Sequence, residues 1–356
     1  MYSIIFKVAL LTVELLFWTF IGLIIYNYIG FNILMKFLAL FKKQNTTIFN
    51  SQDSDLPYIS ILLAVYNEEN VIREKIESTF NTNYPKNKIR FLIGSDNSSD
   101  ATENIIKEYS TTNSKIELYR FESRTGKPGI INALAEKTKD ELLILTDANI
   151  YFKDSTLFEL VKHFKNKTIG LVCANVLNPS TLEKGISHQE TAYIYRENTL
   201  KYREGLYGCM IGTFGAAYSI RNELYTPVPN GFISDDFFIS MKVVDKNFKA
   251  ILEPAAICYE VFSYEISEEL KRKSRYAVGN FQNMRYFNSM LWTFWKMKTF
   301  CFWSHKVIRW ITPWLIIAIL VSLSNLIFKN KFYLSIGILT TFGFLLVAIE
   351  IGRAHV

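Results

Sequence analysis

Three long apolar stretches flank a middle part of the chain in which short apolar runs alternate with polar ones. Val8–Ile29 carries one charged residue, Glu14, whereas Trp310–Phe328 and Phe332–Ile349 carry none. A helix needs about 20 apolar residues to cross the hydrocarbon core of a bilayer. The pattern therefore predicts one transmembrane helix near the N-terminus and a transmembrane hairpin near the C-terminus. We interpret Glu14 as a packing detail rather than as a proton or substrate site.

Basic residues beside the first stretch predict how the chain lies in the membrane. Lys36, Lys42 and Lys43 follow it, and the positive-inside rule places that end in the cytoplasm. The apolar run is too long for a cleaved signal peptide, and no small-residue cleavage site follows it. We therefore expect an integral protein of the inner or cell membrane, with its N-terminus outside and its middle domain in the cytoplasm.

The segment before the hairpin is rich in aromatic side chains. Between Leu291 and Trp303, tryptophan and phenylalanine residues alternate with Lys296 and Lys298. Such a composition is typical of an amphipathic helix in the headgroup plane of a membrane. The alternative is an ordinary helix of the protein core.

These features divide the chain into five parts. We expect a membrane helix with a juxtamembrane linker over residues 1–56, a cytoplasmic domain over 57–287, the interfacial helix over 288–306, and the hairpin over 307–350. The last six residues, 351–356, back-translate to the start of a common sequencing adapter. We therefore expect them to be an artefact, and the gene to be truncated inside its last span.

The middle domain alternates between two kinds of segment. Continuous apolar runs typical of buried strands occupy residues 58–65, 90–94, 116–119, 141–146 and 169–174. Helical segments are predicted between them at 69–80, 100–109, 130–137 and 156–164. Strands that alternate with helices imply an α/β domain with a parallel sheet covered on both faces.

Polar residues follow three of these strands directly. Asn67, Asp96 and Asp147 come one to three residues after a strand, and ligands of such sheets bind beyond the carboxyl ends of the strands. Asp147 and Asn149 offer two hard oxygen ligands that suit Mg²⁺ or Mn²⁺ bound to a diphosphate. A single aspartate at a strand end is also a common turn former.

Two adjacent carboxylates, Asp235 and Asp236, precede another apolar stretch. Their mutual repulsion raises the pKa of one of them, which suits a general base. Acidic residues that favour the N-terminus of a helix are the alternative.

The glycine-rich segments do not match nucleotide-binding fingerprints. No Ser or Thr follows Lys127 in Gly126–Gly129, so this segment is not a P-loop. Gly208, Gly212 and Gly215 do not lie in an N-terminal βαβ turn, so they are not a dinucleotide motif. Close packing of the backbone around a substrate is the interpretation that remains.

The charge of the chain lies in its flanks. The formal net charge is +7 and the pI is about 9.0, but residues 57–287 hold 29 basic and 29 acidic residues. The excess of basic residues therefore lies beside the predicted membrane helices and reflects membrane topology. We expect no nucleic-acid partner. Four cysteines without a CxxC pair, together with four histidines, argue against a disulfide scaffold and a zinc site.

Taken in order, the motifs of the middle domain resemble those of a known family. They are AVYNEE (64–69), Asp96, GKPGIINAL (126–134), TDAN (146–149), GTFGAAYSIRNEL (212–224), SDD (234–236) and RKSRY (272–276). The series is similar to that of the membrane-bound family-2 glycosyltransferases, which include the cellulose, hyaluronan, chitin and poly-N-acetylglucosamine synthases. The resemblance implies a GT-A fold, an α/β domain with a mixed, mostly parallel sheet.

The resemblance also implies a role for each motif. The nucleotide is expected to contact residues of the first two motifs and the lysine of the third: Ala64, Tyr66, Asn67, Glu68, Asp96 and Lys127. Asp147 and Asn149 stand at the metal-binding DxD position. Asp236 is the expected general base, and Asp235 next to it is expected to contact the substrate or nucleotide.

Residues 272–276 align with the QxxRW motif, which implies substrate contacts for Arg272, Arg275 and Tyr276. Three positions depart from the family pattern. Asn149 replaces the second carboxylate of DxD, Arg272 replaces Gln, and Tyr276 replaces the tryptophan that stacks on the acceptor sugar in processive synthases. Tyrosine can also stack on a sugar. The basic residues near Arg275 are alternatively a solvated face near lipid.

The activity implied is inverting transfer of a sugar from a nucleotide sugar, expected to be UDP-linked, to a growing polysaccharide or glycan at the membrane. Mg²⁺ or Mn²⁺ is the expected cofactor, and membrane lipids are expected partners. Two alternatives stay open. One is transfer of a single sugar to a lipid or polyprenyl-phosphate carrier. The other is a catalytically inactive, membrane-anchored nucleotide-binding protein, which Asn149 would permit.

Overall fold

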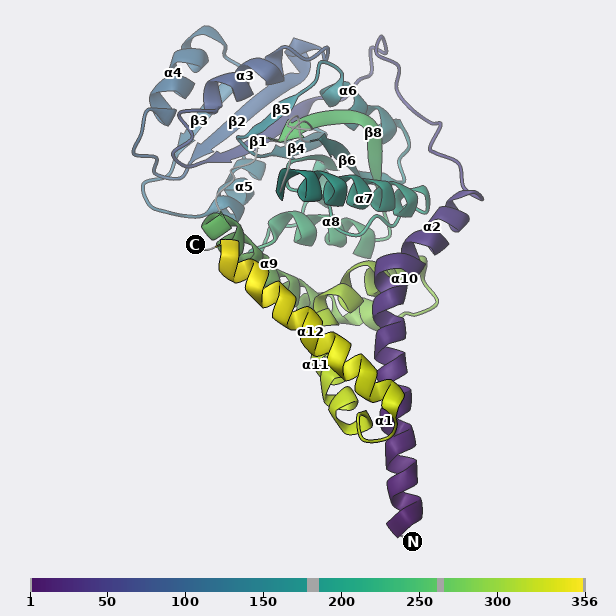
Figure 1. Ribbon diagram of the computed structural model, residues 1–356. Coiled ribbons are helices and arrows are strands. Elements are labelled where there is room, and N and C mark those ends of the chain that lie inside the picture. The colour runs from purple at the N-terminus through teal and green to yellow at the C-terminus, as the bar shows by residue number, and fades with distance from the viewer. Residues whose placement is uncertain (1, 178–185, 261–265, 355–356) are drawn as a thin grey trace. The chain divides into compact units, whose positions relative to one another are not determined.

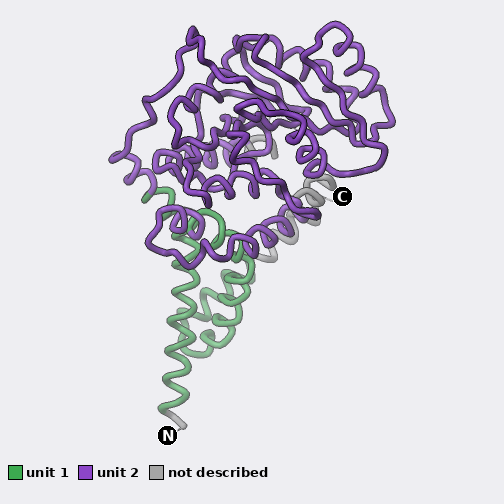
Figure 2. Tube along the Cα trace, turned by 180° about the vertical axis from the view of Figure 1, so that it is seen from behind, with its two compact units in different colours: residues 1–34, 304–356 green, residues 35–303 purple. Residues whose placement is uncertain are grey.

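The computed structural model describes residues 2–177, 186–260 and 266–354, with side chains for 4–177, 191–260 and 273–343. The chain forms two compact units (Figure 2). Residues 35–303 form the first, which we call the α/β unit. Residues 1–34 and 304–356 form the second, which we call the helical unit.

The α/β unit is built on an eight-stranded sheet with the order β3-β2-β1-β4-β7-β6-β8-β5 (Figure 1). Strands β1, β2, β3 and β4 pair in parallel, as do β6 and β8, whereas β7 is antiparallel to both of its neighbours and β5 is antiparallel to β8. The strands are β1 (Ile59–Val65), β2 (Ile89–Ser95), β3 (Ile116–Arg120), β4 (Leu142–Thr146), β5 (Ile150–Phe152), β6 (Ile169–Leu177), β7 (Ala217–Arg221) and β8 (Lys249–Glu260). The predicted mixed, mostly parallel α/β sheet is confirmed.

Helices cover both faces of this sheet. Figure 1 shows α3, α4 and α6 on one face and α5, α7 and α8 on the other. Their bounds are α3 (Ile72–Phe80), α4 (Thr102–Thr112), α5 (Lys127–Ala135), α6 (Thr156–Val161), α7 (Ile186–Leu206) and α8 (Asp235–Asp245). Buried apolar side chains of β1, such as Ile61, pack in one core with Ile72 and Ile76 of α3. Because both faces are covered, β1, β2, β4 and β6 are buried along almost their whole length.

Helix α5 begins three residues earlier than the sequence pattern predicts. Gly126 precedes it with φ +78°, a conformation that favours glycine. Pro128 then lies in the first turn, where proline fits well. At Gly94 of β2, a Cβ atom would lie 2.3 Å from Cγ2 of Ile130. The glycine therefore lets α5 lie close to the sheet, with Lys127 at the N-terminal end of the helix.

The helical unit contains three apolar helical segments. They are α1 (Tyr2–Ile25), which continues into a π-helical turn and into residues 31–34 of α2 (Phe31–Ala39), then α11 (Ile308–Leu326) and α12 (Lys331–Ala354). Among the residues with described side chains, Ile4–Ala39 and Met297–Leu326 are long and apolar enough to cross a membrane. The proposed adapter residues 351–356 lie outside the described side chains.

Glu14 forms a polar contact inside this apolar unit. It pairs with Lys329, in the turn between α11 and α12. The hydroxyl of Tyr333 donates to Glu14 Oε1 at 2.5 Å, and Trp18 Nε1 donates to the same hydroxyl at 3.2 Å. Glu14 thus links α1 to the α11–α12 turn, which agrees with its interpretation as a packing feature.

The aromatic segment before α11 is not one continuous helix. A 3-10 helix, Asn288–Trp292, is followed by a turn and by the short helix α10, Met297–Cys301. The hydroxyl groups of Thr293 and Thr299 lie 2.6 Å apart, and Trp303 Nε1 donates to Leu291 O at 3.0 Å. These bonds fold the segment back on itself, so the single helix expected over 291–303 is wrong.

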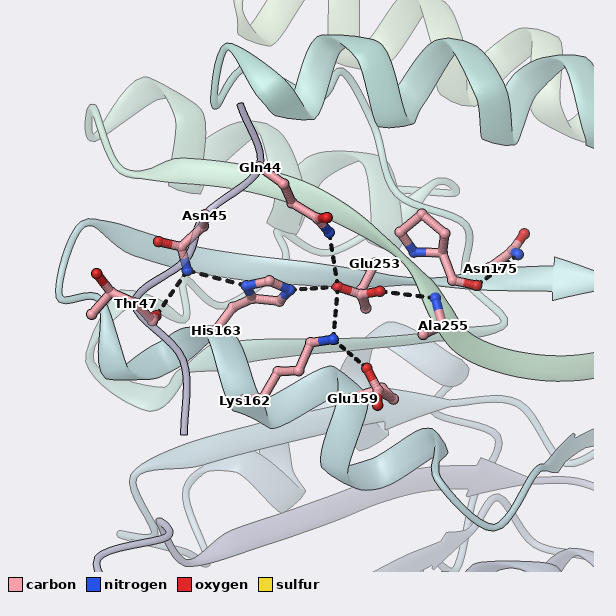
Figure 3. A network of polar contacts seen from close by, with 10 residues as sticks. Gln44, Asn45, Thr47, Glu159, Lys162, His163, Asn175, Glu253 and Ala255 are labelled. Atoms are coloured by element: carbon pink, nitrogen blue, oxygen red, sulfur yellow. Dashed lines mark hydrogen bonds and ion pairs between the residues drawn. The ribbon is translucent and has the colours of Figure 1, made fainter. Parts of the chain in front are cut away.

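A buried polar network anchors the linker after α2 to the sheet (Figure 3). Glu253 of β8 lies 2.5 Å from Nε2 of His163 and 3.2 Å from Nζ of Lys162. Gln44 of the linker donates to the same carboxylate at 3.2 Å, and Asn45 contacts Nδ1 of His163 at 3.1 Å. Burial disfavours the charge of Glu253, but the bonds with His163 and with the backbone N–H of Ala255, together with the charge of Lys162, hold its pKa below the usual value.

We predict that Glu253→Ala lowers the free energy of unfolding by about 3–5 kcal/mol, because it leaves buried polar groups without their anionic partner. Thermal unfolding of the purified chain in detergent measures the effect. Asp53→Ala is the matched control, since Asp53 forms an exposed ion pair with Lys165, in the same 3-10 helix as His163. Equal shifts of the unfolding midpoint in both variants would contradict the structural role of Glu253.

Candidate active site

The carboxyl ends of β1, β2 and β4 lie side by side at one edge of the sheet. Asp96, directly after β2, is 3% exposed. Its carboxylate accepts bonds from the backbone N–H groups of Thr125 (2.6 Å) and Gly126 (3.0 Å) and from Nε of Arg124 (3.1 Å). Asp96 therefore fixes the loop that leads into α5, immediately before Lys127.

Residues after β1 form the neighbouring wall of the site. The guanidinium of Arg124 lies 3.3 Å from the centre of the Tyr66 ring, a short cation–π contact. Asn67 has φ +54°, and its Oδ1 accepts from Ser99 N at 2.9 Å. Ala64 lies within β1 opposite Gly94. Tyr66 thus presents an exposed aromatic face beside Asp96.

Glu68 lies half-buried at the start of the same loop. Burial raises its pKa, and the negative charges of Asp147 and Asp100 raise it further. Its backbone N–H donates to Oγ1 of Thr102 at 2.8 Å. The loop after β1 is therefore hydrogen-bonded to the start of α4, and the carboxyl group of Glu68 interacts electrostatically with Asp147.

Lys127 lies among the acidic residues of the site. Its Nζ is 2.6 Å from Oδ1 of Asp147 and 3.9 Å from Oδ2 of Asp235. Burial disfavours the ammonium, but the charges of Asp147, Asp235 and Asp236 raise the pKa of Lys127 above its usual value. Lys127 is therefore a permanent cation at the end of β4.

Gly215 lies at the centre of this cluster. A Cβ atom at Gly215 would lie 3.4 Å from Asp236 Oδ2, 3.6 Å from Asp147 Oδ2 and 3.6 Å from Lys127 Nζ. The glycine leaves open the space on which these three side chains converge. Gly215 belongs to the segment that the sequence pattern linked to close packing around a substrate.

Asp235 and Asp236 begin helix α8. Asp235 is buried, and within the described residues its Oδ2 accepts no hydrogen bond. Burial and the charge of Asp235 raise the pKa of Asp236 to about 6, while Lys127 opposes that shift. The predicted charge repulsion and the predicted helix N-terminus are therefore both present in the structure.

Helix α9, Ile266–Tyr286, supports the loop that carries these carboxylates. A Cβ atom on Gly279 would lie 2.3 Å from Ser234 Oγ, so the glycine allows α9 to approach closely. Gln282 accepts from Ile233 N at 3.2 Å and donates to Gly231 O at 2.9 Å. Helix α9 therefore holds the segment before Asp235 in place.

The residues aligned with QxxRW lie on α9. The side chains of Arg275 and Tyr276 are exposed, and the guanidinium of Arg275 lies 5.9 Å from the centre of the Tyr276 ring. The side chain of Arg272 lies outside the described residues. The structure thus brings together Lys127, Asp147, Asp235 and Asp236, and it leaves Tyr276 at the surface.

The oxygen ligands of the site suit a divalent metal only in part. Asp147 is 38% exposed at the end of β4, and Asn149 follows two residues later. In the described part of the chain, no group of three His, Cys, Asp or Glu side chains lies close enough to hold a metal ion. One carboxylate and one amide fit Mg²⁺ or Mn²⁺ when a diphosphate and water complete the coordination.

Several residues of the site did not stand out in the sequence. Arg124 lies three residues before Lys127 in the same loop, and that spacing was the available signal. In the sequence, Gln282 resembles an ordinary polar residue of an amphipathic helix, as does Lys75, whose Nζ donates to Oγ1 of Thr146 at 2.8 Å. Their contacts depend on which helix face meets the sheet or the loop, which a single sequence pattern does not give.

Comparisons with known proteins place this geometry in a family. A model described as "Glycosyl transferase family 2" matches residues 60–222, and one described as "Glycosyl transferase family group 2" matches residues 153–347. The second match covers more than half of the chain.

Curated relatives agree with these models. Poly-beta-1,6-N-acetyl-D-glucosamine synthase of Staphylococcus epidermidis is 26% identical over 238 residues, which cover 65% of this chain and 57% of that protein. Beta-monoglucosyldiacylglycerol synthase of Trichormus variabilis is 32% identical over 119 residues, 33% of this chain and 25% of that protein. The chain spans less than two thirds of the length of these relatives.

A solved structure shares the fold. Mannosyltransferase PcManGT from Pyrobaculum calidifontis, in complex with GDP-Man and Mn²⁺, matches with a TM-score of 0.71 at 18% sequence identity. The match covers 93% of this chain and 92% of that one. The GT-A fold expected from the sequence is confirmed. On the two family models and this fold together, the chain belongs to the family-2 glycosyltransferases.

Proposed function

We propose that the chain transfers a sugar from a nucleoside diphosphate sugar, UDP-linked, to a glycan acceptor with inversion at the anomeric carbon. The observation that carries the proposal is the convergence of Lys127, Asp147 and Asp236 on the space above Gly215. A cation beside a metal-ligand pair can hold a diphosphate, and a carboxylate with a raised pKa can accept a proton.

The nucleoside has a suitable platform next to this space. The exposed ring of Tyr66, backed by Arg124, offers a flat face on which a base can stack. Asp96 holds the loop between this platform and Lys127. A nucleotide with its base at Tyr66 would direct its diphosphate toward Lys127 and Asp147.

The reaction is a single displacement. The acceptor hydroxyl oxygen forms a bond with the anomeric carbon, and the bond from that carbon to the diphosphate oxygen breaks. Asp236 accepts the proton of the acceptor hydroxyl, while Lys127 neutralises charge that develops on the leaving diphosphate. Asp147 and Asn149 would hold Mg²⁺ or Mn²⁺, which supplies further positive charge to the diphosphate.

The acceptor is proposed to be presented at a membrane. In the α/β unit, Trp292, Phe294 and Trp295 are 65%, 59% and 80% exposed. Exposed aromatic side chains grouped in one turn are typical of a membrane-interface contact. Together with the two apolar helical stretches, this turn supports action at the cytoplasmic membrane face.

Two acceptor classes fit such a site. The synthase relative supports a growing polysaccharide, whereas the glucosyldiacylglycerol synthase relative supports a lipid acceptor. Membranes that contain the chain, supplied with a panel of labelled UDP- and GDP-sugars, distinguish the two. A polysaccharide product retains label at high molecular mass, and a lipid product carries it into organic solvent.

We predict that Asp236→Asn abolishes transfer but leaves UDP binding unchanged. The amide keeps the shape of the side chain but cannot accept the proton. Turnover in membranes measures transfer, and calorimetry on purified protein measures binding. Wild-type protein that binds UDP but turns over no donor would support the alternative of an inactive nucleotide-binding protein, and a fully active Asp236→Asn variant would remove Asp236 from the role of base.

We predict an acid-side inflection of kcat/KM near pH 6. Asp236 can accept a proton only when it is ionised, and its raised pKa makes it mostly protonated below pH 6. Activity should therefore rise as the pH increases through about 6. A pH–rate profile at subsaturating donor measures this, and an inflection near pH 4, where an ordinary aspartate titrates, would contradict the environment described for Asp236.

We predict that Asp147→Ala weakens the Mn²⁺-dependent part of UDP binding about 10-fold or more, since it removes the only carboxylate of the proposed ligand pair. Calorimetric titrations with Mn²⁺ and with a chelator separate the metal-dependent part from the rest. Asp245→Ala, at the far end of α8, is the control and should behave like the wild type. An unchanged Mn²⁺ dependence in Asp147→Ala would rule out the ligand role.

A further inference from the structure

Lys75 of α3 is a fully buried lysine beneath the active site, with no exposed surface. Its Nζ donates to Oγ1 of Thr146 at 2.8 Å and to the backbone oxygen of Ile150 at 2.7 Å. These two residues stand on either side of Asp147-Ala148-Asn149. One ammonium group therefore links the beginning and the end of the turn that carries both proposed metal ligands.

The bonds continue from this turn to the centre of the site. Oγ1 of Thr146 donates to the backbone oxygen of Ala216 at 2.8 Å, and the N–H of Asp147 donates to the same oxygen at 3.3 Å. Ala216 follows Gly215, on which the acidic side chains and Lys127 converge. Lys75 is thus the inner end of a chain of hydrogen bonds that fixes the backbone on both sides of the reaction space.

Burying the ammonium group of Lys75 costs free energy, which argues against a purely structural role for this lysine. Burial lowers the pKa of Lys75 to about 7, because the ammonium has left water. Its partners Thr146 and Ile150 are neutral, and the ring of Phe152, 3.8 Å away, gives a further favourable contact. A methionine would fill the same space without the desolvation cost, so the two bonds to the turn are the distinctive contribution of the lysine.

We propose that Lys75 is a positioning residue that holds the Asp147–Asn149 turn in the conformation that binds a metal–diphosphate complex. The proposal rests on the proposed function, because it assigns Lys75 to the same donor site. Side chains that orient metal ligands from behind typically change metal affinity or activity about 10–100-fold when they are removed.

The first test is Lys75→Met, which keeps an unbranched side chain of nearly the same length and removes both bonds. We expect the dissociation constant for UDP in the presence of Mn²⁺ to rise about 10–100-fold. We expect UDP binding in a chelator to change little, since Tyr66 and Asp96 lie outside the turn. Calorimetry on the purified full chain measures both values, and thermal unfolding confirms that the comparison is made on folded protein.

Two further variants separate positioning from stability. Thr79→Val is the matched control, because Thr79 is buried in α3 and its hydroxyl donates to the backbone oxygen of Lys75 at 2.8 Å, away from the Asp147–Asn149 turn. It should lower the unfolding midpoint without changing the Mn²⁺ dependence. Thr146→Val removes the hydroxyl that Lys75 contacts and should weaken Mn²⁺-dependent binding, with a double variant no worse than Lys75→Met alone.

The outcomes are distinct. Absence of any UDP binding by the wild-type chain would overturn the proposed function, and this inference with it. Wild-type binding that depends on Mn²⁺, with the same dependence in Lys75→Met, would overturn the inference alone. Additive effects of Lys75→Met and Thr146→Val in the double variant would also overturn the positioning role. If Lys75→Met does not fold, Thr146→Val alone decides, and an unchanged Mn²⁺ dependence in that variant would overturn the inference.

Discussion

Electrostatic repulsion among acidic side chains is the constraint on which the active site depends. Asp147, Asp235 and Asp236 come from two elements that meet around Gly215, and the ammonium of Lys127 lies among them. The helix that carries Lys127 reaches this point because glycine lets it lie close to β2. A negatively charged diphosphate therefore enters a site that already holds several carboxylates, so its charge must be neutralised by cations. This requirement explains why a metal ion and Lys127 are expected to bind the diphosphate together.

Strands β1, β2, β4 and β6 could be predicted from the sequence because helices bury both of their faces, which makes each of them a mostly apolar run. β7 lies between β4 and β6, but its sequence contains Ser219 and Arg221, and no strand was predicted there. The other strands gave weaker signals. β5 has three residues, and β8 contains Glu253 and Pro254 within an otherwise apolar run. Helix α7 is rich in charged residues, several of which are buried. In each case tertiary contacts decide the conformation, and local pattern does not.

The residues of the site could be predicted where the order of the strands determines their position. Carboxyl ends of parallel strands meet at one edge, so Asp96 and Asp147 could be assigned to one site from their positions alone. The supporting residues were not predictable in this way. The role of Lys75 depends on a helix face packed against β4 and β5, and in sequence it resembles any lysine of a solvated helix. Asp96, which is expected to contact the nucleotide, also holds the loop before Lys127.

The polar network around Glu253 has a consequence for shortened forms of the protein. Residues 44 and 45 belong to the linker that follows the first apolar helix, yet their side chains complete the bonding of a buried acid and a buried imidazole. The α/β unit accordingly begins at residue 35 and not at the first strand. A fragment that begins at residue 57 would lack Gln44 and Asn45 and would expose Glu253 and His163 to water. The N-terminus of a shortened form is therefore better placed before Gln44.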